Sequence, residues 1–312
     1  MPKFSLKGKK IVVTGGAGFL GRAVTAALTK EKPAELRSLA SKDYDLRETA
    51  QARAAVAGAD VVIHLAANVG GIGYNQEHPA QLFYDNLLMS THVLHESYKA
   101  GVKKFVGIGT ICAYPKFTPV PFKESDLWNG YPEETNAPYG LAKKMLLVQS
   151  QAYRKEFGFN SIYLLPTNLY GPGDNFDPRS SHVIPALIEK FVTAVEKNKR
   201  EVIVWGTGAP TREFLYVEDA ARAIVLAAQN YSGDEPINLG SQFEISIAEL
   251  AHLIGDLVKF KGRITFDTTK PDGQPRRKID TTRAQEHFNF VSSVAFRDGL
   301  NETIQWYRKQ RK

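Results

Sequence analysis

Short apolar runs alternate with longer stretches of helical periodicity along the first half of the chain. The apolar runs predict strands at residues 10–14, 35–39, 60–66, 104–109 and 160–165. The stretches between them carry apolar residues at helical spacing and predict helices at 23–29, 49–57, 79–100 and 138–156. This alternation is typical of βαβ units, so we expect an α/β fold with a doubly wound parallel sheet covered on both faces. Such sheets bind ligands at the carboxyl ends of their strands, so functional residues are expected just after each apolar run.

The pattern changes after Pro166. Residues 170–181 are rich in glycine, proline, aspartate and asparagine, which indicates a structured loop. Beyond it the pattern predicts helices at 184–197 and 217–229, a strand at 201–205 and a polar loop at 270–278. We therefore expect residues 1–165 to form a first domain, joined by about 213–235, and residues 166–312 to form mostly a smaller α/β lobe.

The composition narrows the function without defining it. Apolar residues make up 43% of the 312 residues and charged residues 23%, as in a folded globular protein. The chain has 40 Lys and Arg against 33 Asp and Glu, a net charge of +7. These cations are spread along the chain, so a site for an anionic small molecule is favoured over a nucleic-acid partner.

The single cysteine, Cys112, excludes an intrachain disulfide and gives no sign of an oxidising compartment. No apolar run is long enough for a signal peptide or a membrane span. We expect a cytoplasmic protein with no membrane partner and no bound metal.

Three glycines, Gly15, Gly18 and Gly21, follow the first strand and open the first helix. Glycines at this spacing permit a tight turn, let the backbone approach a pyrophosphate, and let the helix pack closely on the strand. The amino end of the helix offers N–H groups and a positive dipole end to phosphates. The turn predicts a dinucleotide site in a Rossmann-type domain, and a purely structural turn is the alternative.

The end of the second strand bears on which dinucleotide is bound. Sites for NAD usually carry an acidic residue there, on the ribose 2′-hydroxyl. Here the strand is followed by Ser41 and Lys42, whose hydroxyl and ammonium favour the 2′-phosphate of NADP. In the alternative, Lys42 is a solvated surface residue and Asp43 binds the ribose.

Tyr139 and Lys143 lie four residues apart at the start of a predicted helix, and residues at this spacing share a helix face. We expect the lysine ammonium and the charge of an oxidised nicotinamide to lower the pKa of the phenol from about 10 toward neutrality. Tyr139 would then exchange protons with a substrate. Thr110, which ends the fourth predicted strand, adds a hydroxyl to this group.

The glycine turn, residues 64–67, Thr110 and the Tyr139/Lys143 pair together resemble the extended short-chain dehydrogenase/reductase superfamily. The resemblance covers the whole chain and implies that Thr110, Tyr139 and Lys143 are the catalytic triad for hydride transfer at a sugar carbon. It also implies a set of NADP(H)-binding residues: Gly15, Ala17, Gly18, Phe19, Leu20, Gly21, Ser41, Lys42, Asp45, Leu46, Ala66, Ala67, Ile108, Gly109, Tyr139, Lys143, Pro166, Asn168, Leu169 and His182.

A narrower resemblance is to the GDP-L-fucose synthase family. It rests on blocks at 68–72, 112–116, 166–172, 181–187, 204–208 with 212–215, and 270–273. That family epimerises GDP-4-keto-6-deoxy-D-mannose at C3 and C5 and then reduces C4 with NADPH. The resemblance implies that Cys112 and His182 are the proton-transfer pair, against the alternatives of a core cysteine and a histidine that only bonds the backbone. It also implies a homodimer formed through the long helices at 79–100 and 138–156.

For the GDP-sugar substrate, the resemblance implies binding by Lys190, Trp205, Arg212 and Asp272, and the basic pair Arg276 and Arg277 adds charge or forms a solvated loop. The chain departs from the family pattern at Thr110-Ile111, where the family usually has two serines, and at Lys190, where it has arginine. These departures leave a related sugar open, such as a GDP-linked 6-deoxyheptose. The sequence is also compatible with a redox-neutral nucleotide-sugar epimerase, or with a protein that kept the fold and lost the chemistry.

Overall fold

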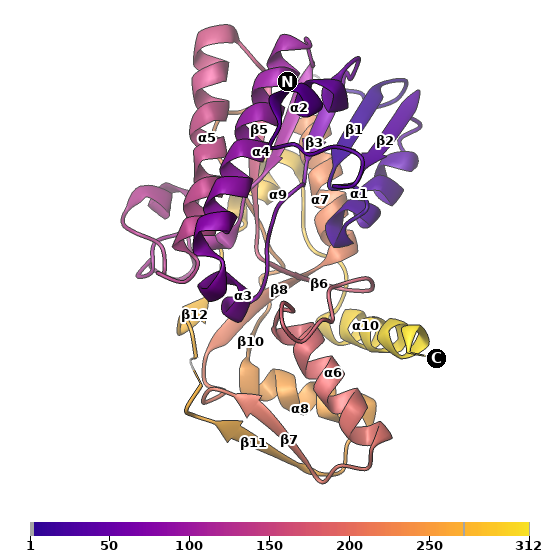
Figure 1. Ribbon diagram of the computed structural model, residues 1–312, viewed down its shortest axis with the longest axis vertical. Coiled ribbons are helices and arrows are strands. Elements are labelled where there is room, and N and C mark those ends of the chain that lie inside the picture. The colour runs from indigo at the N-terminus through magenta and orange to yellow at the C-terminus, as the bar shows by residue number, and fades with distance from the viewer. Residues whose placement is uncertain (1–2, 271, 312) are drawn as a thin grey trace.

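The computed structural model describes residues 3–270 and 272–311, and its strands and helices alternate as the apolar pattern predicts (Figure 1). The strands are β1 (Lys10–Thr14), β2 (Glu35–Leu39), β3 (Val61–His64), β4 (Lys104–Ile108), β5 (Ser161–Pro166), β6 (Asn168–Tyr170), β7 (Glu201–Trp205), β8 (Thr211–Tyr216), β9 (Ile237–Leu239), β10 (Glu244–Ser246), β11 (Arg263–Asp267) and β12 (Arg276–Arg277). The α-helices are α1 (Phe19–Thr29), α2 (Thr49–Val56), α3 (Ile72–Glu77), α4 (Pro79–Lys99), α5 (Ala137–Phe157), α6 (Val183–Glu196), α7 (Val217–Asn230), α8 (Ile247–Val258), α9 (Thr282–Phe288) and α10 (Phe296–Gln310). Two 3₁₀ turns, η1 (Ile111–Ala113) and η2 (Glu124–Trp128), lie between β4 and α5.

The main sheet has six parallel strands in the order β2-β1-β3-β4-β5-β9. Side chains alternate between its two faces, so Ile11 and Val13 pack in one core with α1 and α7, whereas Val12 packs in another with α2, α4 and α5 (Figure 1). Both faces are apolar because helices cover both. The predicted Rossmann-type α/β class is confirmed.

The strand order reverses between β1 and β3, because the chain first crosses to β2 and then returns to build the rest of the sheet on the other side of β1. A crevice opens at such a switch point, at the carboxyl ends of the strands. Gly15, Ala66 and Gly109 follow three neighbouring strands at this edge.

The second part of the chain builds a smaller layer of sheet and helix below the carboxyl edge of the main sheet (Figure 1). Strand β8 pairs with β10, β12 and β6, and β7 pairs with β11. Helices α6, α8 and α10 pack over these strands around a third core that includes Phe191, Phe214 and Leu250. Helix α7, however, contributes Ile224 to the core of the main sheet.

Several boundaries differ from the sequence prediction. Strands β3 and β4 are shorter than predicted and end at His64 and Ile108, so Thr110 lies in the turn after β4. The predicted polar loop at 270–278 contains β12, which pairs with β8. Among the described residues, no helix combines the length and the apolar character needed to cross a membrane.

Candidate active site

A cavity of about 1570 Å³ lies between the carboxyl edge of the main sheet and the smaller layer. Its volume exceeds the roughly 300–1,000 Å³ of an ordinary small-molecule site, so it has room for two ligands side by side. All the predicted site residues line it except Lys42 and Arg276. Residues far apart in the chain, such as Gly15 and His182, thereby line the same cavity.

The glycine turn forms a backbone cradle at one end of the cavity. Gly15 has a φ of 68°, and a side chain there would bring its Cβ to 2.8 Å from the Ala66 nitrogen. A Cβ on Gly21 would lie 2.1 Å from the Gly15 carbonyl oxygen. Helix α1 begins at Phe19 with no side-chain cap, so its first N–H groups are free for an anion. This backbone fits the diphosphate of a dinucleotide.

Lys42 is exposed and is not among the residues that line the cavity, so its expected role at the 2′-phosphate stays a prediction. The backbone N–H of Ala40 donates to the Asp43 carboxylate at 2.8 Å, and this tight turn after β2 directs Ser41, but not Lys42, to the cavity. The cation on this part of the wall is Arg47, which sequence reasoning missed.

Arg47 is held in place by two carboxylates. It lies 2.7 Å from Asp45 and 3.0 Å from Asp85. Its hydrogen bonds lower the pKa of Asp45 to about 2. Asp45 and Leu46, both predicted, line the cavity beside it.

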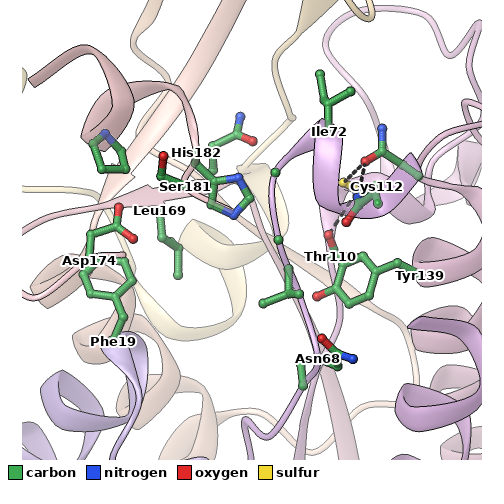
Figure 2. A pocket seen from close by; sticks show the side chains of 18 of the residues that line it. Phe19, Asn68, Ile72, Thr110, Cys112, Tyr139, Leu169, Asp174, Ser181 and His182 are labelled. Atoms are coloured by element: carbon green, nitrogen blue, oxygen red, sulfur yellow. Dashed lines mark hydrogen bonds between the residues drawn. The ribbon is translucent and has the colours of Figure 1, made fainter. Parts of the chain in front are cut away.

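Thr110 and Tyr139 come together on one wall of the cavity (Figure 2). The Thr110 hydroxyl accepts a hydrogen bond from the Cys112 backbone N–H at 3.1 Å and so caps η1. Helix α5 approaches this turn closely because residue 140 is glycine: a Cβ there would lie 2.3 Å from the Cys112 carbonyl oxygen. The close approach brings Tyr139 beside the turn that carries Cys112.

The pKa of the Tyr139 phenol differs from the expectation. Burial raises the pKa of Tyr139 above its ordinary value, and the Thr110 hydroxyl opposes the rise only in part. Lys143 is 2% exposed, and burial lowers its pKa to about 8. The expectation that the phenol pKa falls toward neutrality is therefore wrong for the protein alone, because desolvation of the buried phenol raises its pKa. The positive charge of an oxidised nicotinamide remains the other expected cause of a lowered phenol pKa.

Cys112 and His182 face the cavity from two different parts of the chain (Figure 2). The Cys112 side chain is partly buried, and its sulfur contacts Asn136 and Arg277, each at 3.8 Å. His182 precedes α6, and its ring makes no hydrogen bond within the described residues. Burial of this ring among the cavity walls lowers its pKa, and the nearby Arg277 lowers it further, which favours neutral imidazole. The sulfur is not sealed in the core, and the imidazole is not engaged by the backbone.

The far end of the cavity carries the predicted substrate residues. The ammonium groups of Lys190 and Lys270 lie 5.3 Å and 5.5 Å from the centre of the Trp205 ring, and Trp205 is largely exposed. Arg212 donates to the Asp272 carbonyl oxygen at 3.3 Å, and burial lowers the pKa of Arg212 to about 10. The Asp272 carboxylate itself bonds Thr207, so it orders the wall. The cations suit a diphosphate and the indole suits a planar base.

Two polar groups of the cavity were not singled out from the sequence. Asp174 and Ser181 each have a buried oxygen without a hydrogen-bond partner in the described part of the chain. Both line the cavity, where Figure 2 shows them near Phe19 and His182. Burial raises the pKa of Asp174 to about 7. Asp174 follows the Gly-Pro-Gly run of the predicted loop, but no sequence signal indicated its burial.

Across the residues that the structure describes, no cluster of three or more His, Cys, Asp or Glu side chains could hold a metal ion.

The chain is similar to known proteins over nearly its whole length. The model of the NAD dependent epimerase/dehydratase family matches residues 11–240. The chain is similar to GDP-L-fucose synthase 1 of Arabidopsis thaliana, with 42% identity over 305 residues that cover 97% of this chain and 94% of the relative.

Two solved structures are also similar. The GDP-L-fucose synthetase from Naegleria fowleri bound to NADP has a TM-score of 0.89 and 32% identity, covering 99% of this chain and 97% of the other. A GDP-6-OMe-4-keto-L-xylo-heptose reductase from C. jejuni has a TM-score of 0.91 and 26% identity, covering 99% of each chain.

Proposed function

The chain belongs to the NAD dependent epimerase/dehydratase family and within it to the GDP-L-fucose synthases, and from this premise we propose that it epimerises and reduces a GDP-4-keto-6-deoxy sugar with NADPH. The proposed substrate is GDP-4-keto-6-deoxy-D-mannose, and the proposed product is GDP-L-fucose. The observation that carries the proposal is the convergence of two sets of groups on one cavity: Thr110, Tyr139 and Lys143 for reduction, and Cys112 with His182 for proton transfer at carbon.

The cofactor fits the backbone cradle between Gly15 and Gly21, where a Cβ would collide with the chain. In the proposal, residues 1–165 hold NADPH with help from about 213–235, and residues 166–312 hold most of the substrate. When bound, NADPH supplies the hydride that reduces the C4 ketone. The cations Lys190, Arg212 and Arg277 bind the substrate diphosphate, and Trp205 packs against the base.

The epimerisation uses the acidity of carbons next to a ketone. Thr110 and Tyr139 donate hydrogen bonds to the C4 oxygen and stabilise the enolate that forms when a neighbouring C–H bond breaks. One of Cys112 and His182 removes the proton, and the other returns a proton to the opposite face of the ring. A thiol and an imidazole suit this exchange because both change protonation near neutral pH.

The reduction needs a proton on the C4 oxygen. The Tyr139 hydroxyl gives this proton, and the buried Lys143 beside it favours the phenolate that is left behind. Thr110 holds the same oxygen, so the sugar does not move between the two kinds of chemistry. Burial keeps bulk water away from this wall, which strengthens these hydrogen bonds.

The proposal is tested with purified protein, GDP-4-keto-6-deoxymannose and NADPH. We expect one NADPH to be consumed for each substrate molecule. The consumption is measured as the loss of nicotinamide absorbance. Turnover without NADPH loss would support the redox-neutral epimerase instead, and the absence of turnover across a panel of GDP-4-keto sugars would support a protein without this chemistry.

A related sugar is the second candidate, and one position favours it. Ile111 is buried and lines the cavity where a serine would offer the sugar a hydroxyl. The similar C. jejuni structure is named as a reductase of a GDP-4-keto heptose. Faster turnover of a GDP-4-keto-6-deoxyheptose than of the hexose in the same assay would select this candidate.

The assembly and location are part of the proposal. Helices α4 and α5 pack side by side and leave Phe83, Tyr84 and Val148 exposed, an apolar surface that supports a homodimer through these helices. Light scattering behind size exclusion tests this, and a monomer at micromolar concentration would contradict it. A cytoplasmic location is proposed because the single cysteine does not require an oxidising compartment.

A further inference from the structure

Arg277 contacts the sulfur of Cys112, although the two residues are 165 positions apart in the chain. Its Nη1 donates to Cys112 Sγ at 3.8 Å. Its Nε donates to the Gln274 side-chain oxygen at 2.8 Å, and Gln274 is itself buried and bonded to the Lys116 carbonyl. Within residues 3–270 and 272–311, no carboxylate forms an ion pair with Arg277. The guanidinium is therefore fixed, and its charge is not neutralised by a neighbouring acid.

The other side of the sulfur has a fixed hydrogen-bond acceptor. The Cys112 S–H donates to the side-chain oxygen of Asn136 at 3.8 Å. The orientation of Asn136 is set, because its NH₂ group donates to Glu133 and its oxygen accepts from Asn75 at 3.1 Å. The sulfur thus has an acceptor for its proton on one side and a cation on the other. Each protonation state of Cys112 has a partner.

We infer that Arg277 is a positioning residue for Cys112, and that its guanidinium stabilises the thiolate through which the sulfur exchanges protons with the substrate. The inference deepens the proposed function and rests on it. It gives Arg277 a role in epimerisation in addition to the diphosphate binding proposed above.

The proton transfer passes through a thiolate in either direction. When the sulfur acts as a base, the C–H bond next to the ketone breaks, its electron pair enters the enolate, and the proton forms an S–H bond. When the sulfur acts as an acid, the S–H bond breaks, the proton joins the carbon, and the electron pair stays on sulfur. In both directions the negative charge on sulfur lies beside the guanidinium of Arg277.

The same guanidinium acts on the second proton-transfer group. Arg277 lowers the pKa of His182, after the larger effect of burial. It also lowers the pKa of Arg212. The other titratable groups around the sulfur are Tyr139 on α5, Glu133 before that helix, and Arg212 on β8. None of these supplies a direct hydrogen bond from a cation to the sulfur, and Arg277 does.

Because Cys112 is the only cysteine of the chain, alkylation by iodoacetamide reports on this sulfur alone. The rate is measured against pH on the purified protein without substrate, for the wild type and for Arg277→Gln. Loss of a cation at this distance is expected to slow alkylation about 10-fold at pH 7. Arg277→Lys keeps the charge and is expected to recover part of the rate.

Arg276→Gln is the matched control, because Arg276 lies on the same strand but pairs with Glu244 and does not line the cavity. Its alkylation profile should equal that of the wild type. A wild-type profile for Arg277→Gln would overturn the inference, whatever the variant does to KM. Since no substrate is used, this result is independent of whether the proposed sugar is correct.

With GDP-4-keto-6-deoxymannose, the inference adds a second expectation. At saturating substrate, Arg277→Gln should slow deuterium exchange at C3 and C5 by a factor at least as large as its increase in KM. A residue that only binds diphosphate would change KM alone. Unchanged exchange at saturating substrate would contradict the inference and leave the proposed reaction intact. Failure of the wild type to exchange at all would contradict the proposed function, while the alkylation result would still stand.

Discussion

The backbone N–H of Cys112 donates to the hydroxyl of Thr110 at 3.1 Å, so a group proposed for reduction and a group proposed for epimerisation share one turn of chain. This turn follows β4 directly, and β4 lies in the middle of a sheet buried on both faces. The rigid strand therefore fixes both groups relative to the same substrate carbonyl. The same C4 ketone can then acidify the protons on C3 and C5 and be reduced itself, without the sugar leaving the site.

Replacing Tyr139 by phenylalanine removes the proposed proton donor and keeps the ring that packs against the turn. We expect NADPH oxidation to fall roughly 100- to 10,000-fold, as is typical for the loss of a general acid. Binding of NADPH, measured by fluorescence titration, should change little. A variant that reduces the ketone at the wild-type rate would remove Tyr139 from the mechanism.

Cys112→Ser replaces the thiol with a hydroxyl that does not ionise near neutral pH. We expect deuterium incorporation at the epimerised carbon to slow roughly 100-fold, while reduction of the unepimerised ketone continues. The product is identified by nuclear magnetic resonance as the sugar with its original configuration. Formation of the fully epimerised sugar at the normal rate would show that Cys112 has no role in proton transfer.

Gly140→Ala tests the close approach of α5 to the Cys112 turn. Alanine is the better helix former, but its Cβ would lie 2.3 Å from the Cys112 carbonyl oxygen, so the helix must move. We expect a loss of about 1–3 kcal/mol in the free energy of unfolding and a fall in activity. Gly73→Ala is the control, because a Cβ at this helical glycine meets no atom within 4 Å. Equal stability changes in the two variants would contradict the packing argument.

Asp174 is expected to make the free energy of unfolding fall as the pH rises. Burial raises its pKa from 3.8 to about 7, so the folded protein binds this proton more tightly than the unfolded chain. Its contribution is complete below about pH 4 and is lost as the pH rises through 7. Relative to Asp174→Asn, which stays neutral, the wild type should lose about 2 kcal/mol of unfolding free energy over that range, a value reduced for partial exposure. Parallel Tm profiles of the two proteins across this range would contradict the burial of the carboxyl.

The parts of the fold that the sequence predicted well are those determined by local pattern. The run of β-branched residues at β1 and the glycines that follow it predict a strand, a tight turn and a helix start without reference to the rest of the chain. Strands β6, β8, β9, β10, β11 and β12 were not predicted, because their places depend on pairing between distant segments. β9 has only three residues, and its place at the end of the sheet depends on pairing with β5.

The site residues also divide into those found from a local motif and those that depend on long-range contacts. Residues within one motif, such as Tyr139 and Lys143, could be found from their spacing. Whether Lys42 reaches the cofactor could not be read from its spacing, because it lies in a turn closed by the side chain of Asp43, outside the cavity lining. The contact between Arg277 and Cys112 could not be predicted, since it depends on β12 pairing with β8 inside a segment whose sequence is polar and irregular. The burial of Asp174 likewise depends on how the loop after β6 packs over α1.

The most direct test of the account is a single reaction in deuterium oxide, with GDP-4-keto-6-deoxymannose and protiated NADPH, analysed by nuclear magnetic resonance. The account predicts one NADPH oxidised per product, deuterium from solvent at C3 and C5, and protium from the cofactor at C4. A reduced product with protium at both C3 and C5 would contradict it, because the thiol and imidazole would then take no part in the reaction.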